Sequence, residues 1–413
     1  MKKIFNITKL DHFGRGISRN DEKIIFIENA LPKEEVSVTN IVDKKNISET
    51  TADEILKKSS DRRDTTKLCK YYGVCGGCNI MHMSYMCQLE FKRNKVVELM
   101  KKFAGIDESK IKDIIPSLEF EYRNKITLKV KEKIGLLKNK SYELVNIDSC
   151  SISRPKINEI IGKLNTLKFE NIEEIVIRCG YNNESMVVFK CCGDIDIDYY
   201  LSSLKECTDT LVMIKDGIEN VIFGKGYITE KLGKYYFKIS PLSFFQVNTT
   251  TAEKLYDVVK EYASLDSTES VLDLYSGTGT IGIYLSEYAK SVLGVEINSE
   301  AVEDAKENVK LNNIKNAEFI CYDIGKMKKE CNNIDVAIVD PPRSGLSKKA
   351  LLNISEIASK KLIYISCNPS TLARDLNLLK DKYYLKELTP VDMFPNTYHV
   401  ECVSVLHRKS LEK

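Results

Sequence analysis

The chain has 413 residues, with 62 Lys and Arg residues against 59 Asp and Glu residues and a net charge of +3. No apolar run approaches the roughly 18 residues that a membrane-spanning helix needs, and the first residues do not resemble a secretory signal. The 13 cysteines are therefore expected to be reduced thiols of a cytoplasmic protein and not a disulfide scaffold. At about 150 residues per domain, the length predicts two or three domains.

Short strands are predicted in the first sixty residues, over residues 4–10, 24–27 and 36–41, with turn residues between them. Several short strands at this spacing indicate a small β-barrel. Small barrels of this kind often bind RNA, although a fold alone does not establish a function.

Three cysteines follow in a compact loop, Cys69, Cys75 and Cys78, with two glycines directly before the third. The glycines allow the backbone to curl closely around a bound group. Together with the distant Cys150, these cysteines form a soft, all-thiolate ligand set. Such a set is typical of an iron–sulfur cluster or a zinc ion.

Positive charge gathers around this loop, because residues 61–140 hold 18 Lys and Arg residues against 10 Asp and Glu residues. A predicted strand over residues 122–130 carries basic side chains spaced mostly by two, which would share one face. A phosphate backbone is the partner that such a stripe suggests, and a merely solvated face is the alternative. The stripe consists of Arg123, Lys125, Lys129, Lys131 and Lys133.

The C-terminal part begins with a predicted helix over residues 251–262 and a buried strand, Ser270–Leu274. A glycine-rich turn, Gly277-x-Gly279-x-x-Gly282, follows the strand and opens a helix, which lets a ligand approach the backbone. Glu296 follows the next predicted strand and is placed to accept hydrogen bonds from a ribose diol. These features indicate a nucleoside-binding, Rossmann-like half, and the turn alone also allows a nicotinamide dehydrogenase.

Two further predicted strands, residues 334–339 and Lys361–Ser366, end in Asp340 and Cys367. Since the carboxyl ends of parallel strands face the ligand crevice, both side chains are expected beside the cofactor. Glu401 comes directly before the last predicted strand, residues 402–406. A candidate nucleophile and a candidate general base therefore lie in the same part of the chain.

Taken together, these residues resemble the uracil-5 RNA methyltransferases that use S-adenosylmethionine, specifically the branch with an N-terminal TRAM domain and a [4Fe-4S] cluster. The resemblance covers nearly the whole chain. In chain order, the matching stretches are residues 10–17, 30–32, the cysteine loop with Cys150, and residues 244–248, 272–279, 294–296, 340–343, 366–369 and 399–401.

The resemblance implies an α/β fold class with three domains. Residues 1–58 would form the TRAM domain, an OB-like, RNA-binding β-barrel. Residues 59–240 would form a central α+β domain that holds the iron–sulfur cluster and binds RNA. Residues 241–413 would form the Rossmann-like S-adenosylmethionine-dependent methyltransferase domain.

It also implies the roles of individual residues. Cys367 would be the nucleophile that adds to carbon 6 of uracil, and Glu401 would be the base that removes the carbon-5 proton. The thiolate is the reactive form, so the site must favour ionisation of Cys367. The residues implied in cofactor binding are Gln246, Tyr275, Thr280, Glu296, Asp323 and Asp340.

The resemblance assigns Cys69, Cys75, Cys78 and Cys150 as the ligands of the [4Fe-4S] cluster. Cys87 could instead complete a local zinc site with the first three. We prefer Cys150, because Cys87 lies near the start of a predicted helix over residues 87–103. The cluster is expected to be structural, since methyl transfer needs no redox step.

The expected partner is RNA, with 23S ribosomal RNA favoured over transfer RNA, and the chain is expected to act as a monomer without membrane contact. The target base must leave its stack before Cys367 can reach it. Two other classes stay open at this point. One is the nicotinamide oxidoreductase, and the other is a non-catalytic iron–sulfur RNA-binding protein.

Overall fold

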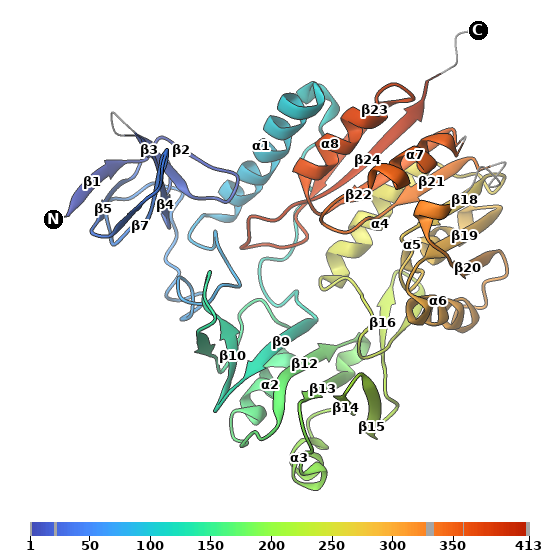
Figure 1. The fold of residues 1–413 in the computed structure, drawn as a ribbon, viewed down its shortest axis with the longest axis horizontal. Helices are drawn as coiled ribbons and strands as arrows, with labels where there is room; N and C mark the ends of the chain where they lie inside the picture. Colours follow the sequence, from blue (N-terminus) through green and yellow to red (C-terminus); the bar gives the residue numbers. More distant parts are fainter. Residues whose placement is uncertain (1, 20–22, 328–333, 358, 410–413) are drawn as a thin grey trace.

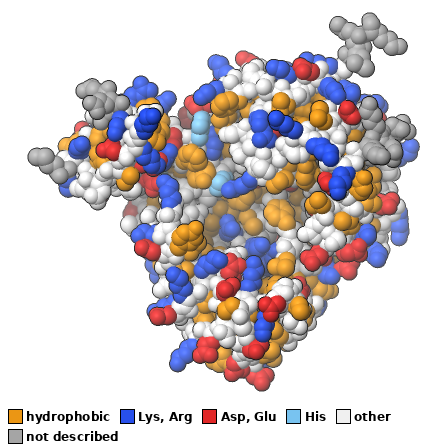
Figure 2. All heavy atoms as spheres, viewed as in Figure 1, with side chains coloured by type: hydrophobic (Ala, Val, Ile, Leu, Met, Phe, Trp, Pro, Cys, Tyr) orange, Lys and Arg blue, Asp and Glu red, His pale blue; other side chains and the backbone are white. Residues whose placement is uncertain are grey.

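The computed structural model describes residues 2–19, 23–327, 334–357 and 359–409. The N-terminal strands form a small unit at one side, a seven-stranded sheet follows, and a second seven-stranded sheet with helices holds the C-terminal part (Figure 1). These parts border a hollow on the face shown in Figure 2, where basic and hydrophobic side chains line the rim.

The N-terminal unit packs two small sheets around one apolar core that includes Ile25, Ile27 and Val36. Two of the predicted strands are each divided in the structure, residues 4–10 into the first two strands and residues 36–41 into the fifth and sixth. One sheet consists of β1 (Lys3–Asn6), β5 (Glu35–Val38) and β8 (Glu54–Lys57), and the other of β2 (Lys9–Leu10), β3 (Gly16–Arg19), β4 (Ile24–Glu28), β7 (Ile47–Thr51) and β6 (Ile41–Asp43).

A long helix, α1 (Tyr85–Ala104), follows the cysteine loop. Ser84 caps its first turn by accepting a hydrogen bond from the Cys87 N–H, and Gly105 ends it in the left-handed conformation. The helix extends the predicted one by two residues at its start and one at its end. It runs from the N-terminal unit toward the C-terminal sheet (Figure 1) and therefore joins two distant parts of the chain.

The middle sheet has apolar side chains on both faces. In one strand, Ile175 and Ile177 join the core under two helices, while Val176 points into the core shared with the C-terminal part. In spatial order its strands are β11 (Leu144–Asn146), β10 (Ile134–Leu137), β9 (Lys125–Val130), β12 (Ile172–Cys179), β13 (Ser185–Cys191), β14 (Thr210–Lys215) and β15 (Ile218–Phe223); its helices are α2 (Pro155–Leu164) and α3 (Ile197–Leu204).

The apolar stretch within residues 174–188 does not form a single strand. The apolar run is broken by a turn at Gly180, where η2 (Tyr181–Asn183) reverses the chain, and β12 and β13 pair as an antiparallel hairpin. Asn182 and Asn183 both adopt positive φ there, which asparagine tolerates better than most residues. The two asparagines were the signal for this turn.

The C-terminal sheet combines parallel strands with an antiparallel pair at one edge. The strands Ser270–Leu274 and Lys361–Ser366 have the bounds predicted from the sequence. The other predicted strands differ from the observed ones by one or two residues. In spatial order the strands are β20 (Ala317–Cys321), β19 (Ser291–Glu296), β18 (Ser270–Leu274), β21 (Val336–Val339), β22 (Lys361–Ser366), β24 (Glu401–Arg408) and β23 (Tyr383–Val391).

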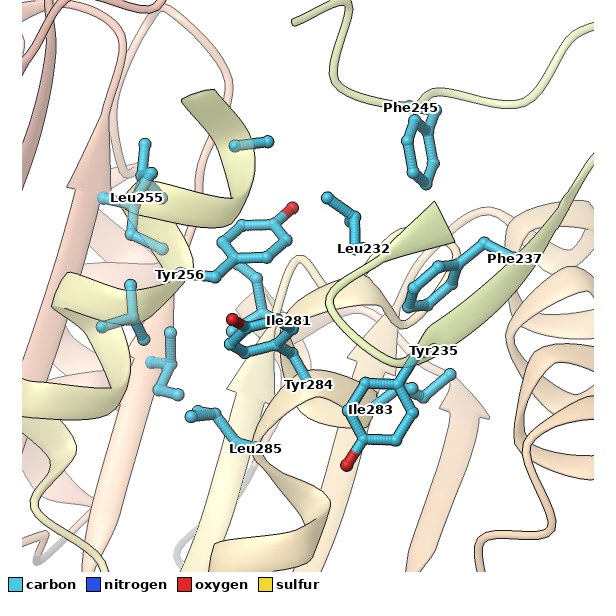
Figure 3. Close-up of a cluster of buried hydrophobic side chains, with 14 of the residues drawn as sticks. Leu232, Tyr235, Phe237, Phe245, Leu255, Tyr256, Ile281, Ile283, Tyr284 and Leu285 are labelled. Atoms are coloured by element: carbon cyan, nitrogen blue, oxygen red, sulfur yellow. The ribbon is translucent and has the colours of Figure 1, made fainter. Parts of the chain in front are cut away.

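Helices cover both faces of this sheet, and a hairpin connects it to the middle sheet. The buried rings of Tyr256 and Tyr284 meet edge to face, and Phe245 packs beside Phe237 of the hairpin (Figure 3). The hairpin is β16 (Ile228–Leu232) and β17 (Tyr235–Ile239), and the helices are α4 (Thr249–Ala263), α5 (Thr280–Leu285), α6 (Ser299–Leu311), α7 (Lys348–Glu356) and α8 (Pro369–Leu379), with short turns η1 (Glu108–Lys110), η3 (Ser286–Tyr288) and η4 (Ile324–Lys326).

A fully buried ion pair holds α1 to the segment that follows β23. The Lys92 ammonium contacts the Asp392 carboxylate and also donates to the Phe394 carbonyl, with both charged side chains inaccessible to solvent. Burial lowers the pKa of Lys92, and the charge of Asp392 acts in the opposite direction. The pair is therefore a specific cross-link between segments about three hundred residues apart.

We expect Lys92→Met to reduce the free energy of unfolding by about 3–5 kcal/mol, because Asp392 would be left buried without a counter-charge. Urea denaturation measures this change. Lys101→Met, on the exposed side of the same helix, is the control and should stay within about 0.5 kcal/mol of the parent protein. A loss no larger for Lys92→Met than for the control would contradict a structural role of the pair.

Candidate active site

The predicted site residues lie along one edge of the C-terminal sheet, at the ends of neighbouring strands. Taken across the sheet, they form a single row from β20 to β24. The row consists of Asp323 after β20, Glu296 ending β19, Tyr275 after β18, Asp340 after β21, Cys367 after β22 and Glu401 beginning β24.

Strand pairing brings the two predicted catalytic residues together. Ser366 of β22 pairs with Cys402 of the antiparallel β24. One further step in the same register places Cys367 opposite Glu401. The thiol is half-buried and the carboxyl is buried, so the pair lies at the inner wall of the site.

Two carboxyl groups in this row hold their protons more tightly than usual. Burial raises the pKa of Glu401 to about 8, and the charge of Asp340 adds to this effect. Desolvation raises the pKa of Asp340 to about 6. Carboxyl groups shifted in this way are typical of sites that transfer protons near neutral pH.

The pKa of the Cys367 thiol is also raised. Burial raises the pKa of Cys367 to about 11, with further increases from Glu401 and Asp340, while Arg343 partly opposes them. The protein alone therefore keeps this thiol protonated at neutral pH. A bound cationic group beside it would favour the thiolate.

Arg343 and His399 are site residues to which the sequence analysis assigned no role. The Arg343 guanidinium lies 3.1 Å from the His399 ring nitrogens and lowers the pKa of both Cys367 and Glu401. Burial, with help from Arg343, lowers the pKa of His399 to about 3, so the ring is neutral. Both residues lie within stretches that the sequence analysis had matched to the family.

The other half of the row surrounds the glycine turn after β18. Tyr275, Gly277 and Gly279 all adopt positive φ, which folds the chain sharply at the sheet edge. A side chain at Gly279 would collide with Phe319, so this glycine permits close packing. Among the residues that the structure describes, no atom lies within 4 Å of a side chain built at Gly277, and this open position suits the approach of a ligand.

Of three further predicted cofactor residues, Glu296 contacts this turn directly, and the other two bind neighbouring elements. Glu296 accepts hydrogen bonds from the N–H groups of Gly277, Ile297 and Asn298. Asp323 caps η4 through the Gly325 N–H. The Thr280 hydroxyl is 3.0 Å from that of Tyr256, so it binds the protein as well as facing the turn.

Gln246 lies in the loop before α4, where its backbone carbonyl accepts a hydrogen bond from the Asn124 amide of the middle region. Asn124 also binds the Thr249 hydroxyl. The neighbouring Phe244 leaves 69% of its surface exposed. This loop therefore connects the C-terminal sheet to the residues directly before β9.

Asp273 is a third residue whose role the sequence did not reveal. It is fully buried near the end of β18 and accepts a hydrogen bond from the Gly282 N–H at 3.0 Å. Burial raises its pKa to about 7. In the sequence, it could have been noticed as an acidic residue between the apolar residues Leu272 and Leu274. Its hydrogen bond with Gly282 fixes the glycine turn against the sheet.

The four predicted cluster cysteines line one cavity of about 190 Å³. Burial and the neighbouring thiols raise the pKa of both Cys75 and Cys78, and the Gly77 N–H lies 3.4 Å from the Cys75 sulfur. Within the described ranges, no three His, Cys, Asp or Glu side chains converge as ligands of one metal ion. The cavity is lined by Cys69, Cys75, Cys78 and Cys150.

Cys87 lies elsewhere. It belongs to the first turn of α1 and lines a different cavity, between that helix and the N-terminal unit. That cavity also contains Asp61 and Glu90, whose charges raise the pKa of the thiol beyond the effect of burial.

The predicted stripe of basic residues is interrupted. Lys129 is paired with Glu174, and Lys131 and Lys133 lie in the turn beyond β9. Lys125 instead lies with Arg178 and Lys190, and burial together with these charges lowers its pKa to about 8. Arg178 is buried and donates to the Ser243 carbonyl, and Lys190 pairs with Glu174 beside Lys129, so neither residue extends the stripe as exposed positive charge.

The fold and the site define a Rossmann-like methyltransferase. The methyltransferase domain family matches residues 265–404, which include the glycine turn and the strand ends described above. The match excludes the interpretation of the glycine turn as a nicotinamide site.

Relatives extend the similarity over the whole chain. An uncharacterized RNA methyltransferase of Staphylococcus epidermidis is 36% identical, covering 98% of this chain and 97% of its own. One of Clostridium acetobutylicum is 36% identical, covering 97% and 96%. The chain belongs to this family of RNA methyltransferases, so the interpretation as a non-catalytic RNA-binding protein is also excluded.

A solved structure agrees over the same length. The tRNA (uracil-54, C5)-methyltransferase of Pyrococcus abyssi, in complex with S-adenosyl-L-homocysteine, is 29% identical with a TM-score of 0.80, covering 98% of this chain and all of its own. Across the described ranges, no helix is long and apolar enough to cross a membrane.

The shifted pKa of Glu401 predicts a dependence of stability on pH. Between pH 4.5 and 8, the folded protein keeps a proton that the unfolded chain has released, so stability falls as the pH rises. Glu401→Gln removes this loss. Its free energy of unfolding should rise above that of the parent protein by on the order of 4 kcal/mol at pH 8 and approach it near pH 5.

Urea denaturation at several pH values measures this difference. Glu261→Gln changes an exposed carboxylate and is the control, with no trend expected. A constant difference between Glu401→Gln and the parent protein across this range would contradict the raised pKa.

Proposed function

We propose that this RNA methyltransferase transfers a methyl group from S-adenosylmethionine to carbon 5 of a uridine. The placement of Cys367 opposite Glu401 at the carboxyl edge of the sheet is the observation that carries the proposal. It brings a nucleophile and a base to the same ring. The whole-length similarity to a uracil-C5 methyltransferase supports it.

The first step belongs to Cys367. Carbon 5 of uracil is a poor nucleophile, but addition of the thiolate to carbon 6 moves the double-bond electrons into an enolate that reacts at carbon 5. S-adenosylmethionine supplies the methyl group to this carbon. Arg343 is placed to favour the thiolate, because it lowers the pKa of Cys367 against the effect of burial.

The second step belongs to Glu401. Its carboxylate takes the carbon-5 proton, the double bond between carbons 5 and 6 returns, and the bond between Sγ and carbon 6 breaks. Burial keeps water from this carboxyl group, and its raised pKa makes it an effective proton acceptor once ionised.

The remaining residues of the row suit the cofactor. We propose that Glu296 binds the ribose hydroxyls, that Tyr275 packs against the cofactor, and that Asp340 lies between the cofactor and the target uracil. Gln246, Thr280 and Asp323 complete the set. The open face of Gly277 leaves room for the ligand beside this group.

We further propose 23S ribosomal RNA as the substrate, as the family resemblance implies, with residues 1–58 as a TRAM domain and the chain acting as a monomer. Transfer RNA is a second candidate, because the similar Pyrococcus abyssi enzyme is a tRNA methyltransferase of the same length and fold. The hollow shown in Figure 2, with basic side chains at its rim, is suited to folded RNA of either kind.

The cysteine cavity fits a [4Fe-4S] cluster. Four thiols surround a space several times larger than one ion or water molecule needs, and a backbone N–H already points at one sulfur. A tetrahedral zinc site would need its ligands to converge on one point. We propose that Cys69, Cys75, Cys78 and Cys150 hold the cluster.

Protein purified without oxygen should therefore be brown, with iron and sulfide at about four each per chain. Cys150→Ser should lose the colour, because one of the four ligands is removed. Cys87→Ser is the matched control and should keep it. Stoichiometric zinc in colourless protein would instead indicate a zinc site.

The two catalytic roles predict different products. Cys367→Ala should abolish methylation while S-adenosylmethionine still binds, because the activating addition cannot occur. Glu401→Gln should methylate but stall before elimination. A methyl-labelled covalent protein–RNA adduct should then accumulate and survive denaturing electrophoresis.

The double variant, Cys367→Ala with Glu401→Gln, is the control for this adduct and should form none. Normal turnover by the Glu401→Gln variant would show that Glu401 is not the base. An adduct that forms without Cys367 would remove that residue as the nucleophile.

A further inference from the structure

The segment of residues 392–399, which leads directly to Glu401, is held by parts of the chain far from the methyltransferase sheet. At its centre, Asn396 is fully buried and has a φ of 67°. Its backbone carbonyl accepts hydrogen bonds from the N–H groups of Asn79 at 3.0 Å and Ile80 at 3.1 Å. These two residues come directly after Cys78.

The amide side chain of Asn396 is equally occupied. Its oxygen accepts from Arg63 at 2.6 Å and from Gln88 at 3.2 Å, and its nitrogen donates to the Glu119 carbonyl at 2.8 Å. Its own N–H donates to the Gln88 side chain at 2.8 Å. Every polar group of this residue thus binds a residue of the region between 63 and 119.

One face of α1 holds the rest of the segment. Gln88, Lys92 and Lys95 are spaced by four and three residues, so they share a face of the helix. Lys92 donates to the Phe394 carbonyl and Lys95 to the Tyr398 carbonyl, each at 3.0 Å. The contacts run along the segment as far as the residue before His399.

We propose that Asn396 is a positioning residue that couples the cysteine cavity to the base, by fixing the segment before Glu401 to the loop after Cys78. The proposal rests on the proposed function for the role of Glu401. The cavity would then take part in the reaction without any redox step. A group bound in the cavity would order the loop after Cys78, whose N–H groups donate to the carbonyl of Asn396.

Hydrogen–deuterium exchange of the amides in residues 392–401 tests this coupling without RNA. Asn396→Ala removes the side-chain contacts and disfavours the positive φ, so exchange should rise about tenfold. Cys150→Ser lies far from Asn396 in sequence but lines the cavity, and it should raise the same exchange. Unchanged exchange in either folded variant would overturn the proposal.

Asn171→Ala is the matched control. Asn171 also has a positive φ, its carbonyl accepts from the Cys192 N–H at 2.9 Å, and its side chain donates to the Asp194 carbonyl at 2.7 Å. It lies at the far end of the middle sheet. Exchange of residues 392–401 should be the same in this variant as in the parent protein.

The functional arm uses labelled S-adenosylmethionine and total RNA. In Asn396→Ala, turnover should fall by about a hundredfold while the covalent adduct accumulates, because a displaced base slows elimination more than addition. Cofactor affinity should stay within about twofold, as expected for a site on other strand ends. Equal losses of adduct and product in a folded variant would overturn the positioning role.

Lys95→Met provides a second variant if Asn396→Ala does not fold. It removes one contact to the Tyr398 carbonyl, so the adduct should accumulate to a smaller extent, and an unchanged adduct fraction would overturn the proposal. If the parent protein methylates no RNA, the proposed function fails. The exchange result is then still decisive for the coupling.

Discussion

The antiparallel insertion of β24 between β22 and β23 is the constraint on which the site depends. In an all-parallel sheet, the start of this strand would lie at the edge opposite the cofactor turn. Its reversal brings Glu401 to the edge where β22 ends and Cys367 follows. The same edge collects Asp340 and Cys367, both with raised pKa values, and Arg343 partly offsets the increase for the thiol. The chemistry of the site therefore follows from one strand direction.

This crowding explains why the protein alone does not hold the reactive form of the thiol. Burial and two neighbouring acids favour protonated Cys367. A cationic methyl donor at the same edge would change this balance in favour of the thiolate, since opposite charges favour the ionised form. Under the proposed function, ionisation of Cys367 would therefore depend on the bound methyl donor.

Much of this edge could be predicted from the sequence, because continuous apolar strands such as Lys361–Ser366 are punctuated by polar residues where the chain leaves the sheet. The hairpin at Gly180 was not evident from periodicity, because each of its strands contains a continuous apolar run, residues 175–177 and 186–189. The roles of Asn396 and Lys92 were out of reach, because each depends on contacts across some three hundred residues. The pairing of Lys129 and Lys190 with Glu174 likewise joins three strands whose order the sequence does not specify.

Incubation with methyl-tritiated S-adenosylmethionine and total RNA from cells that lack the enzyme, followed by nucleoside analysis, tests the central claim most directly. We expect label in 5-methyluridine, and fractionation of the RNA before digestion distinguishes 23S ribosomal RNA from transfer RNA. Label confined to another nucleoside, or to none while the cofactor is bound, would contradict the assignment of Cys367 and Glu401 to a uracil ring.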